Sequence, residues 1–562
     1  MLVLIVCALL YFGSYWRCWF NPHDEGGTAV LLASRLLQGE RPIVDVQLGY
    51  NVGWYYPLVA LFKLSGPHYL LTRAWFFFLS TCAALATFRL LRITTGSRLV
   101  AILGGLLVIV FPGSQFKNYI PLLAVLNTVA LIQFLRRQEQ SFATAVHDAI
   151  LGGIVLGITF LTRIDLGFLF ALLWLGALAW LLLDRRLSWG TKASRAAATA
   201  GILGVLTAAL QLPTFLDARH RGFHHEFVAQ YLEPAFLSEN IRKVLHLPAA
   251  QKPAGKGRRA ARNFVAAAEQ GGSLPRIEPA AVWSSSEPQR RALGILTYAP
   301  LIGYGAFLAW CASRLLLSLW RRKFETSQPA FLSLVALGGS LAIFPQFFFF
   351  RPDRPHLAEF MPLYMVASIL TLLAIWREPR NRWGGTWRGA LTLFVAAQCA
   401  LFGWFALQHP SAGTIAARTK RKIFFDGANG VDVFVQKKEY EFLENVRRTI
   451  TAYSHPGDYL ICYPYQPGFN VMTDRPTFVK DVYVDNAKHP RGWVRDTLRE
   501  LAERRPAVIC IDDRAINQIE ASRFSRWAKP VFEYVRENYV LRGTFNEVEI
   551  FSLAAPATAS SQ

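Results

Sequence analysis

The feature that most constrains the fold is a series of long apolar runs. Each measures roughly 18–22 residues, the length that crosses about 30 Å of hydrocarbon as a helix. Because only a helix satisfies its own backbone hydrogen bonds in lipid, we predict about eleven membrane-spanning helices. The predicted spans are residues 1–20, 67–91, 99–112, 119–135, 146–162, 166–183, 196–215, 295–320, 328–350, 357–376 and 388–407. The first lacks a basic start and a cleavage site, so we expect it to be retained.

Basic residues give these spans a direction. The chain carries a net charge of +22, but its Lys and Arg residues are spread over many short loops, a pattern that argues against nucleic-acid binding. If eleven spans alternate, five basic loops share one face, and such loops stay in the cytoplasm. We therefore predict a bacterial inner-membrane protein with a cytoplasmic N-terminus and a periplasmic C-terminus.

The segments between the spans define two domains. Residues 1–407 form the predicted transmembrane module, with outer loops at 21–66 and 216–294. Residues 408–562 form a predicted soluble α/β domain, because short apolar runs alternate there with helical spacing. Its expected strands are 459–463, 507–511 and 547–553, and its expected helices are 491–504 and 521–538. The middle of the long outer loop, 251–262, is rich in Pro, Gly and basic residues and is expected to be mobile.

Acidic residues follow the first span directly. Asp24 and Glu25 lie in an outer loop at the membrane surface, where carboxylates are costly and often functional. They suit a general base or a cation ligand, whereas Asp24 equally suits the N-cap of a helix beginning near Thr28. Asp45 follows, just before an aromatic stretch that is typical of an interfacial belt. Asp24 and Asp45 are also candidate ligands for a divalent cation.

Basic residues on the predicted outer face suit a phosphate. Arg351, Arg354 and His356 share one tight turn. One guanidinium group can donate two parallel hydrogen bonds to two oxygens of a phosphate. The same turn is also compatible with a purely structural Arg–Asp pair. Arg163 is two residues from Asp165, which favours an internal ion pair. Lys117 is a further outer-face cation.

Other chemistry has little support. The chain has neither a phosphate-binding P-loop nor a dinucleotide-binding fingerprint. Asp512 and Asp513 follow a predicted strand, but this strand lies in the outer tail, away from cytoplasmic nucleotides. The seven cysteines show no zinc spacing, so buried thiols are expected.

Four features together resemble the GT-C superfamily of membrane glycosyltransferases, which includes protein O-mannosyltransferases, the lipid A aminoarabinose transferase and arabinofuranosyltransferases. The first is a short initial helix followed by Asp24 and Glu25. The second is the stretch Ala-Ser-Arg-Leu-Leu-Gln-Gly-Glu-Arg-Pro at 33–42, followed by Asp45, although Ile43 replaces a frequent tyrosine. The third is Arg351-x-Asp353-x-x-His356, and the fourth is Tyr-Pro-Tyr-Gln-Pro-Gly at 463–468.

This resemblance implies a GT-C fold and an inverting glycosyltransferase. Such an enzyme moves a sugar from a polyprenyl-phosphate donor to a hydroxyl of a glycan, lipid or protein acceptor on the outer face. The leaving phosphate departs without a proton, so a single carboxylate base is enough. Asp24 is the expected base, with Glu25 or Asp45 second. Arg351, Arg354, His356, Arg163 and Lys117 are expected to bind the donor phosphate.

Two other functions stay open from the residues. A flippase or transporter of a lipid-linked sugar would use the same phosphate-binding residues without a base, although such proteins usually contain internal repeats. A glycan ligase or polymerase of the O-antigen type would share the many spans without needing the acidic first loop.

Overall fold

A computed structural model of the chain describes residues 1–553 except 19–21, 49, 111–116, 138–139, 184–186, 226, 228–285, 322–327, 345–347, 349–353, 379–383, 409–414, 485–491 and 516–519. The chain divides into two compact units. The helical unit comprises Met1–Trp16, Ala74–Thr214 and Arg276–Ala417, and the mixed unit comprises Arg17–Arg73, Phe215–Pro275 and Arg418–Gln562. The expected loop 251–262 lies outside the described residues.

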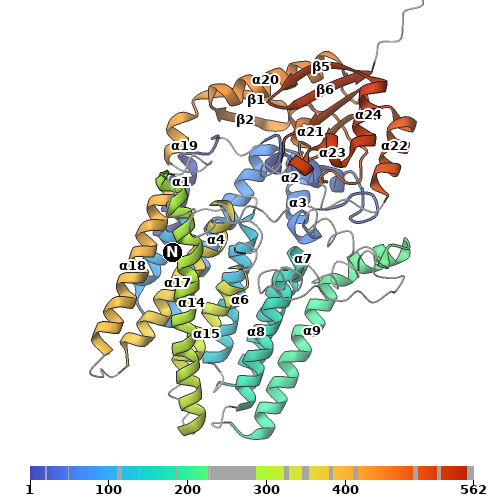
Figure 1. The fold of residues 1–562 in the computed structure, drawn as a ribbon. Helices are drawn as coiled ribbons and strands as arrows, with labels where there is room; N and C mark the ends of the chain where they lie inside the picture. The colour runs from blue at the N-terminus through green and yellow to red at the C-terminus, as the bar shows by residue number, and fades with distance from the viewer. Residues whose placement is uncertain are drawn as a thin grey trace, which may run out of the picture. The chain divides into compact units, whose positions relative to one another are not determined.

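Long helices that run side by side make up the helical unit (Figure 1). Every predicted span contains one. These helices are α1 (Leu2–Gly13), α4 (Tyr69–Thr95), α5 (Arg98–Val110), α6 (Tyr119–Arg136), α7 (Phe142–Thr162), α8 (Ile164–Leu183), α9 (Trp189–His220), α14 (Pro288–Arg321), α15 (Gln328–Leu341), α17 (Arg354–Trp376) and α18 (Gly384–Gln408).

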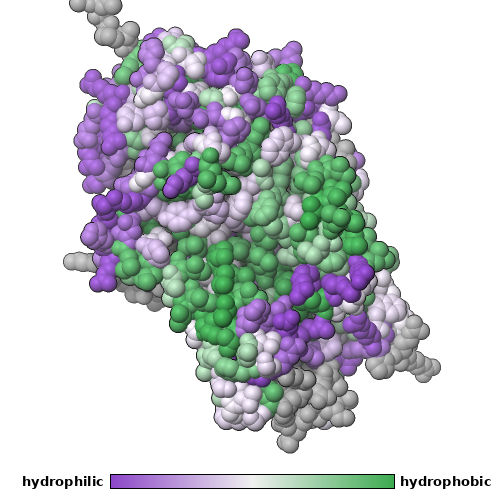
Figure 2. Space-filling view, turned by 180° about the vertical axis from the view of Figure 1, so that it is seen from behind, coloured by the Kyte–Doolittle hydropathy of each residue, from purple (hydrophilic) through white to green (hydrophobic). Residues whose placement is uncertain are grey.

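The predicted membrane character holds for most of these helices. Within the described residues, eight helices are long and apolar enough to cross a membrane. Helices α1, α5 and α15 contain 12, 13 and 14 described residues, fewer than a straight span needs. The count of eleven therefore stays a prediction. Hydrophobic residues gather over a broad area in Figure 2, and large side chains such as Leu172, Leu316 and Leu393 are exposed on the spans.

Small residues let two of these helices approach closely. A Cβ added at Gly153 would meet the Leu206 side chain at 2.9 Å, and one at Gly157 would meet the Leu210 side chain at 2.6 Å. The two glycines are four residues apart on α7 and face α9. This is the small-residue spacing that packs helices in lipid.

The mixed unit contains a four-stranded sheet with the order β3-β4-β6-β5. Strands β3 and β4 are parallel, and β6 is antiparallel to both β4 and β5. The sheet strands are β3 (Leu460–Tyr463), β4 (Val508–Asp512), β5 (Tyr539–Phe545) and β6 (Val548–Leu553), and the helices after β3 are α21 (Gly468–Thr473), α22 (Trp493–Arg504), α23 (Phe524–Trp527) and α24 (Lys529–Asn538). The predicted strands and helices of the tail are thus confirmed, apart from a break between α23 and α24. Strand β5 was not predicted.

A hairpin and a helix precede this sheet and were also not predicted. Strands β1 (Ile423–Gly427) and β2 (Val431–Val435) pair through Asn429 and Gly430, which both have positive φ, as a tight hairpin turn requires. Helix α20 (Lys437–Ala452) begins with a capping box between Gln436 and Glu439.

The segment after the first predicted span, residues 21–66, belongs to this unit as well. Its elements are α2 (Glu25–Leu37), a single 3-10 turn η1 (Val52–Trp54) and α3 (Tyr56–Ser65). The Phe434 backbone N–H donates to the Arg17 carbonyl, and the Gln47 backbone N–H donates to the Lys480 carbonyl. The predicted domain boundary at 407/408 follows chain order, whereas the compact units join residues 17–73 to the tail.

Candidate functional site

Asp24 stands at the first turn of α2. The helix begins at Glu25, three residues earlier than the sequence suggested, and Asp24 occupies its N-cap position. The Asp24 carbonyl accepts hydrogen bonds from the Thr28 backbone N–H and hydroxyl, both at 2.8 Å. Its carboxylate makes no capping hydrogen bond with this helix start as the structure describes it. The N-cap interpretation predicted that this carboxylate would accept a hydrogen bond from the first turn of the helix, and among the described residues this hydrogen bond is not formed.

His23, the residue before Asp24 in the chain, is buried. Its ring stacks on Phe469 at 5.9 Å and meets Phe442 edge-on at 5.6 Å. Burial and the positive charge of Arg514 lower the pKa of His23 to about 3, against a smaller opposing effect of Asp512. His23 is thus neutral at physiological pH and anchors the helix start by aromatic packing.

Two glycines allow the chain to come this close. A Cβ at Gly27 would meet the Gly468 Cα at 2.3 Å, and a Cβ at Gly468 would meet the Pro22 carbonyl oxygen at 1.9 Å. The Gly468 backbone N–H also donates to the His23 carbonyl at 3.0 Å. Only residues without a side chain fit at this crossing. The backbone that carries Asp24 is therefore fixed directly onto the segment 463–468.

A polar cluster lies at the end of β4. Asp512 is buried, and its Oδ2 accepts from Gln466 Nε2 at 2.6 Å. Arg514 donates to the same carboxylate from Nε at 2.8 Å and from Nη2 at 2.5 Å. Asp512 and Asp24 both raise the pKa of Arg514, the first through hydrogen bonds and charge and the second through charge alone, while burial opposes them. The Arg514 guanidinium is thus held by Asp512, and about half of its side chain stays exposed.

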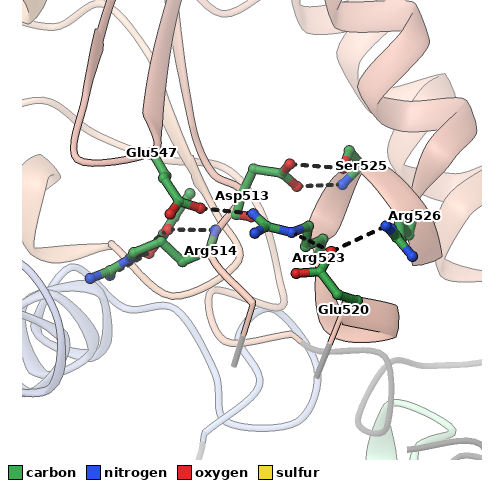
Figure 3. A network of polar contacts seen from close by, with 8 residues as sticks. Asp513, Arg514, Glu520, Arg523, Ser525, Arg526 and Glu547 are labelled. Atoms are coloured by element: carbon green, nitrogen blue, oxygen red, sulfur yellow. Dashed lines mark hydrogen bonds and ion pairs between the residues drawn. The ribbon is translucent and has the colours of Figure 1, made fainter. Parts of the chain in front are cut away.

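Figure 3 shows Arg514 beside a second, exposed network. Asp513 accepts from the Ser525 backbone N–H and hydroxyl and so holds the start of α23. Arg523 bridges Glu520 at 2.9 Å and Glu547 at 2.7 Å. These contacts fix the loop after β4, from which Arg514 projects.

The other predicted carboxylates are placed differently. Asp45 is exposed, and its Oδ2 accepts from the Arg41 backbone N–H at 2.9 Å within a local turn. Glu25 is the first residue of α2, and its side chain lies outside the described part of the chain. Among the described side chains, no three His, Cys, Asp or Glu residues form a group that could hold a metal ion.

The predicted cations belong to the helical unit. Lys117 Nζ lies 3.2 Å from Glu359 Oε1, and both side chains are almost fully buried. Glu359 lies near the start of α17, the helix whose first residues are Arg354, Pro355 and His356. The pair therefore joins the start of α6 to the helix end that carries two predicted phosphate ligands.

Arg163 forms the predicted ion pair. It donates to Asp165 from Nε at 2.8 Å and from Nη2 at 2.9 Å, at the junction of α7 and α8. Arg351 lies outside the described residues, and Arg354 and His356 are described only in their backbone. Their phosphate-binding role stays a prediction.

Four polar residues of these sites were not identified from the sequence as partners. They are Glu359, Gln466, Arg514 and the buried Asp512. Of these four residues, Glu359 alone had an indication in the sequence, because it lies within a predicted apolar span. A charged residue in such a span is usually functional or paired. Nothing in the sequence alone links Gln466 to Asp512, which lies 46 positions later.

Comparison with known proteins shows the fold. No family model matches the chain, and no curated protein matches it. Among solved structures, the chain is similar to apo ArnT from Cupriavidus metallidurans, with a TM-score of 0.52 and 13% identity over 99% of this chain and 98% of that one. It is also similar to ArnT of that organism bound to undecaprenyl phosphate, with a TM-score of 0.53 and 12% identity over 99% of both chains. The chain therefore has the GT-C fold of ArnT, a lipid A aminoarabinose transferase, with many membrane helices and a C-terminal domain that contains a β-sheet.

Proposed function

We propose that the chain is a glycosyltransferase that takes its sugar from a polyprenyl-phosphate donor. The observation that carries this proposal is the likeness, over the full length of both chains, to a structure that holds undecaprenyl phosphate. A shared fold does not by itself assign an activity, so the site must supply independent support. The carboxylate at the start of α2 and the basic residues of the helical unit provide it.

In the proposed reaction, Asp24 removes the proton from the acceptor hydroxyl. The hydroxyl oxygen attacks the anomeric carbon while the bond from that carbon to the donor phosphate oxygen breaks. The phosphate keeps the bonding electrons and stays on the lipid, so no acid is required and the anomeric carbon inverts. Lys117, Arg163, Arg351, Arg354 and His356 would stabilise the charge that develops on this phosphate.

The acceptor is a hydroxyl of a glycan, lipid or protein, and the reaction is proposed for the periplasmic face of a bacterial inner membrane. Basic short loops support this direction, because they are retained in the cytoplasm. A reporter fused after Gln562 should be active only outside the cytoplasm. Activity only inside would contradict the proposed face.

The activity is tested with purified protein, a polyprenyl-phosphate-linked sugar and candidate acceptors, by following release of the lipid phosphate. Asn caps a helix about as well as Asp, so Asp24→Asn preserves the start of α2. We expect this variant to keep the wild-type melting temperature and to transfer sugar about 10²–10⁴-fold more slowly. Asp45→Asn is the matched control and should transfer normally. If Asp24→Asn transfers at the wild-type rate, Asp24 is not the base and Asp45 becomes the next candidate.

A further inference from the structure

The β1–β2 hairpin has two different faces, because side chains alternate across a strand. Its inner face packs on α20, which lies beside it in Figure 1, and the Phe425 ring is 6.4 Å from the Tyr440 ring. Its outer face carries Phe424 and Phe434, which are paired directly across the two strands with their rings 5.5 Å apart. These two residues are 42% and 36% exposed. An exposed aromatic pair on adjacent strands is a candidate contact surface.

Exposed cations border this aromatic pair. The Arg17 guanidinium carbon lies 5.8 Å from the centre of the Phe424 ring. Lys420 and Lys422 immediately precede β1, and both side chains are exposed, as is that of Arg17. Aromatic rings bordered by Lys and Arg are typical of surfaces that lie at the level of lipid headgroups.

Two carboxylates lie at the turn end of the same hairpin. Asp426 and Asp432 are directly opposite each other, where like charges repel. Burial and a hydrogen bond to Asp426 raise the pKa of Asp432, against the opposing charges of Arg17 and His68. A shared proton and two nearby basic groups therefore reduce the negative charge at this end.

The chain itself keeps this hairpin near a membrane surface. The Phe434 backbone N–H donates to the Arg17 carbonyl at 2.6 Å. Arg17 lies within the first predicted span, residues 1–20, and follows Gly13, where α1 ends, by four positions. Four residues extend over about 14 Å at most. The hairpin is therefore attached to the chain close to the level at which the first span leaves the lipid.

We propose that the outer face of the β1–β2 hairpin docks on an anionic lipid surface. Phe424 and Phe434 lie at the boundary between headgroups and acyl chains, where aromatic rings are favoured. Arg17, Lys420 and Lys422 contact the phosphates of anionic headgroups. The hairpin thus anchors the C-terminal domain to the membrane, and this role does not depend on the proposed transfer reaction.

Photocrosslinking of the full chain tests this contact. Benzoylphenylalanine replaces Phe434 in protein reconstituted into nanodiscs of phosphatidylethanolamine and phosphatidylglycerol, and mass spectrometry identifies what it captures. We expect phospholipid adducts. The control carries benzoylphenylalanine in place of Tyr459, which is 40% exposed and directly precedes β3, and it should capture no lipid. The inference is overturned if position 434 captures only protein, or if both positions capture lipid equally.

A change of lipid charge tests the cations. In nanodiscs of phosphatidylcholine alone, lipid capture at position 434 should fall about fivefold or more, because the basic residues lose their anionic partners. Lys420→Gln combined with Lys422→Gln should weaken this dependence on lipid charge. Lys529→Gln removes an exposed cation that pairs with Glu533 on α24 and should leave the dependence intact. Equal capture from both lipid mixtures by the protein with its native lysines would overturn the preference for anionic lipid.

Discussion

The two units treat their charged residues in opposite ways. In the helical unit, Lys117 and Glu359 form a buried ion pair, and Arg163 is paired with its near neighbour Asp165. In the mixed unit, the buried Asp512 carboxylate accepts hydrogen bonds from two side chains, Gln466 and Arg514. An unpaired charge in a low-dielectric bundle is costly, so a buried ion pair needs both of its members, whereas the half-exposed Arg514 keeps contact with solvent. The Lys117–Glu359 pair is thus enclosed, whereas the Asp512–Arg514 pair reaches the surface.

The strongest challenge to this contrast is a double variant in the helical unit. Lys117→Met alone leaves Glu359 buried without its cation and should destabilise the protein by about 3–5 kcal/mol. Adding Glu359→Gln removes the unpaired charge and should recover most of the melting temperature.

Donor use by the recovered double variant then gives the role of Lys117. If Lys117 also binds the donor phosphate, the stable double variant should transfer roughly 10–150-fold more slowly at limiting donor, the effect of one lost charge-assisted contact. Normal transfer at limiting donor would make the pair purely structural. That outcome would sharpen the contrast between the two units.

A second test compares close packing in the two units. Gly468→Ala places a methyl group 1.9 Å from the Pro22 carbonyl oxygen, and backbone cannot move aside as a side chain can. We expect a loss of about 1–3 kcal/mol, measured by thermal unfolding, together with reduced transfer. Gly305→Ala on α14 is the control, because a Cβ there meets nothing within 4 Å. It should be neutral or slightly stabilising.

The comparison of the two units also shows which features could be predicted from the sequence. The apolar runs predicted every long helix of the helical unit, because the length that crosses lipid is set by hydrocarbon thickness. The Arg163–Asp165 pair was predicted because two residues separate its members. The Lys117–Glu359 pair and the Gly27–Gly468 crossing join residues far apart in the chain, so composition and spacing contain no trace of them.

Short elements show the same limit. The hairpin β1–β2 was missed although Asn429-Gly430 is a favoured turn, because its short strands contain Asp426 and Asp432 and lack the continuous apolar run that marks β3 and β4. The sequence also placed the start of α2 near Thr28, since it treated Asp24 and Glu25 as loop residues. The capping role of Asp24 was half right, because its backbone takes the N-cap position while its carboxylate makes no capping hydrogen bond in the part of the helix start that is described.

A third test concerns pH and the mixed unit. The pKa of His23 is lowered to about 3 by burial, whereas an unfolded chain takes up that proton near pH 6.5. The stability that depends on neutral His23 is therefore complete above pH 6.5 and falls as pH is lowered toward 3, by at most about 1.4 kcal/mol per pH unit. His23→Phe keeps a ring against Phe469 and removes the titrating group.

The difference in melting temperature between wild type and His23→Phe should therefore change steadily from pH 6.5 to pH 4, in favour of the variant at low pH. The difference between the two proteins is measured, and not the wild-type melting temperature alone, because Asp481 changes stability with pH in the opposite direction. Burial raises the pKa of Asp481 to about 6, so its protonation stabilises the folded state as pH falls. A difference that is constant with pH would mean that His23 is not held neutral, and the site would then be more polar than its packing indicates.

The smallest change in stability is expected at the Arg163–Asp165 pair, because the Asp165 side of this pair is exposed. The Asp165 side chain is 63% exposed, so Asp165→Asn should cost less than about 1 kcal/mol. Its effect on the donor is more informative. If Arg163 binds the donor phosphate, releasing it from Asp165 should leave the donor KM unchanged or lower, while Arg163→Gln should raise that KM about tenfold or more with little change in melting temperature. If both variants raise the KM equally, the intact pair is what matters, and Arg163 then belongs with Lys117 and Glu359 among the structural pairs of the helical unit.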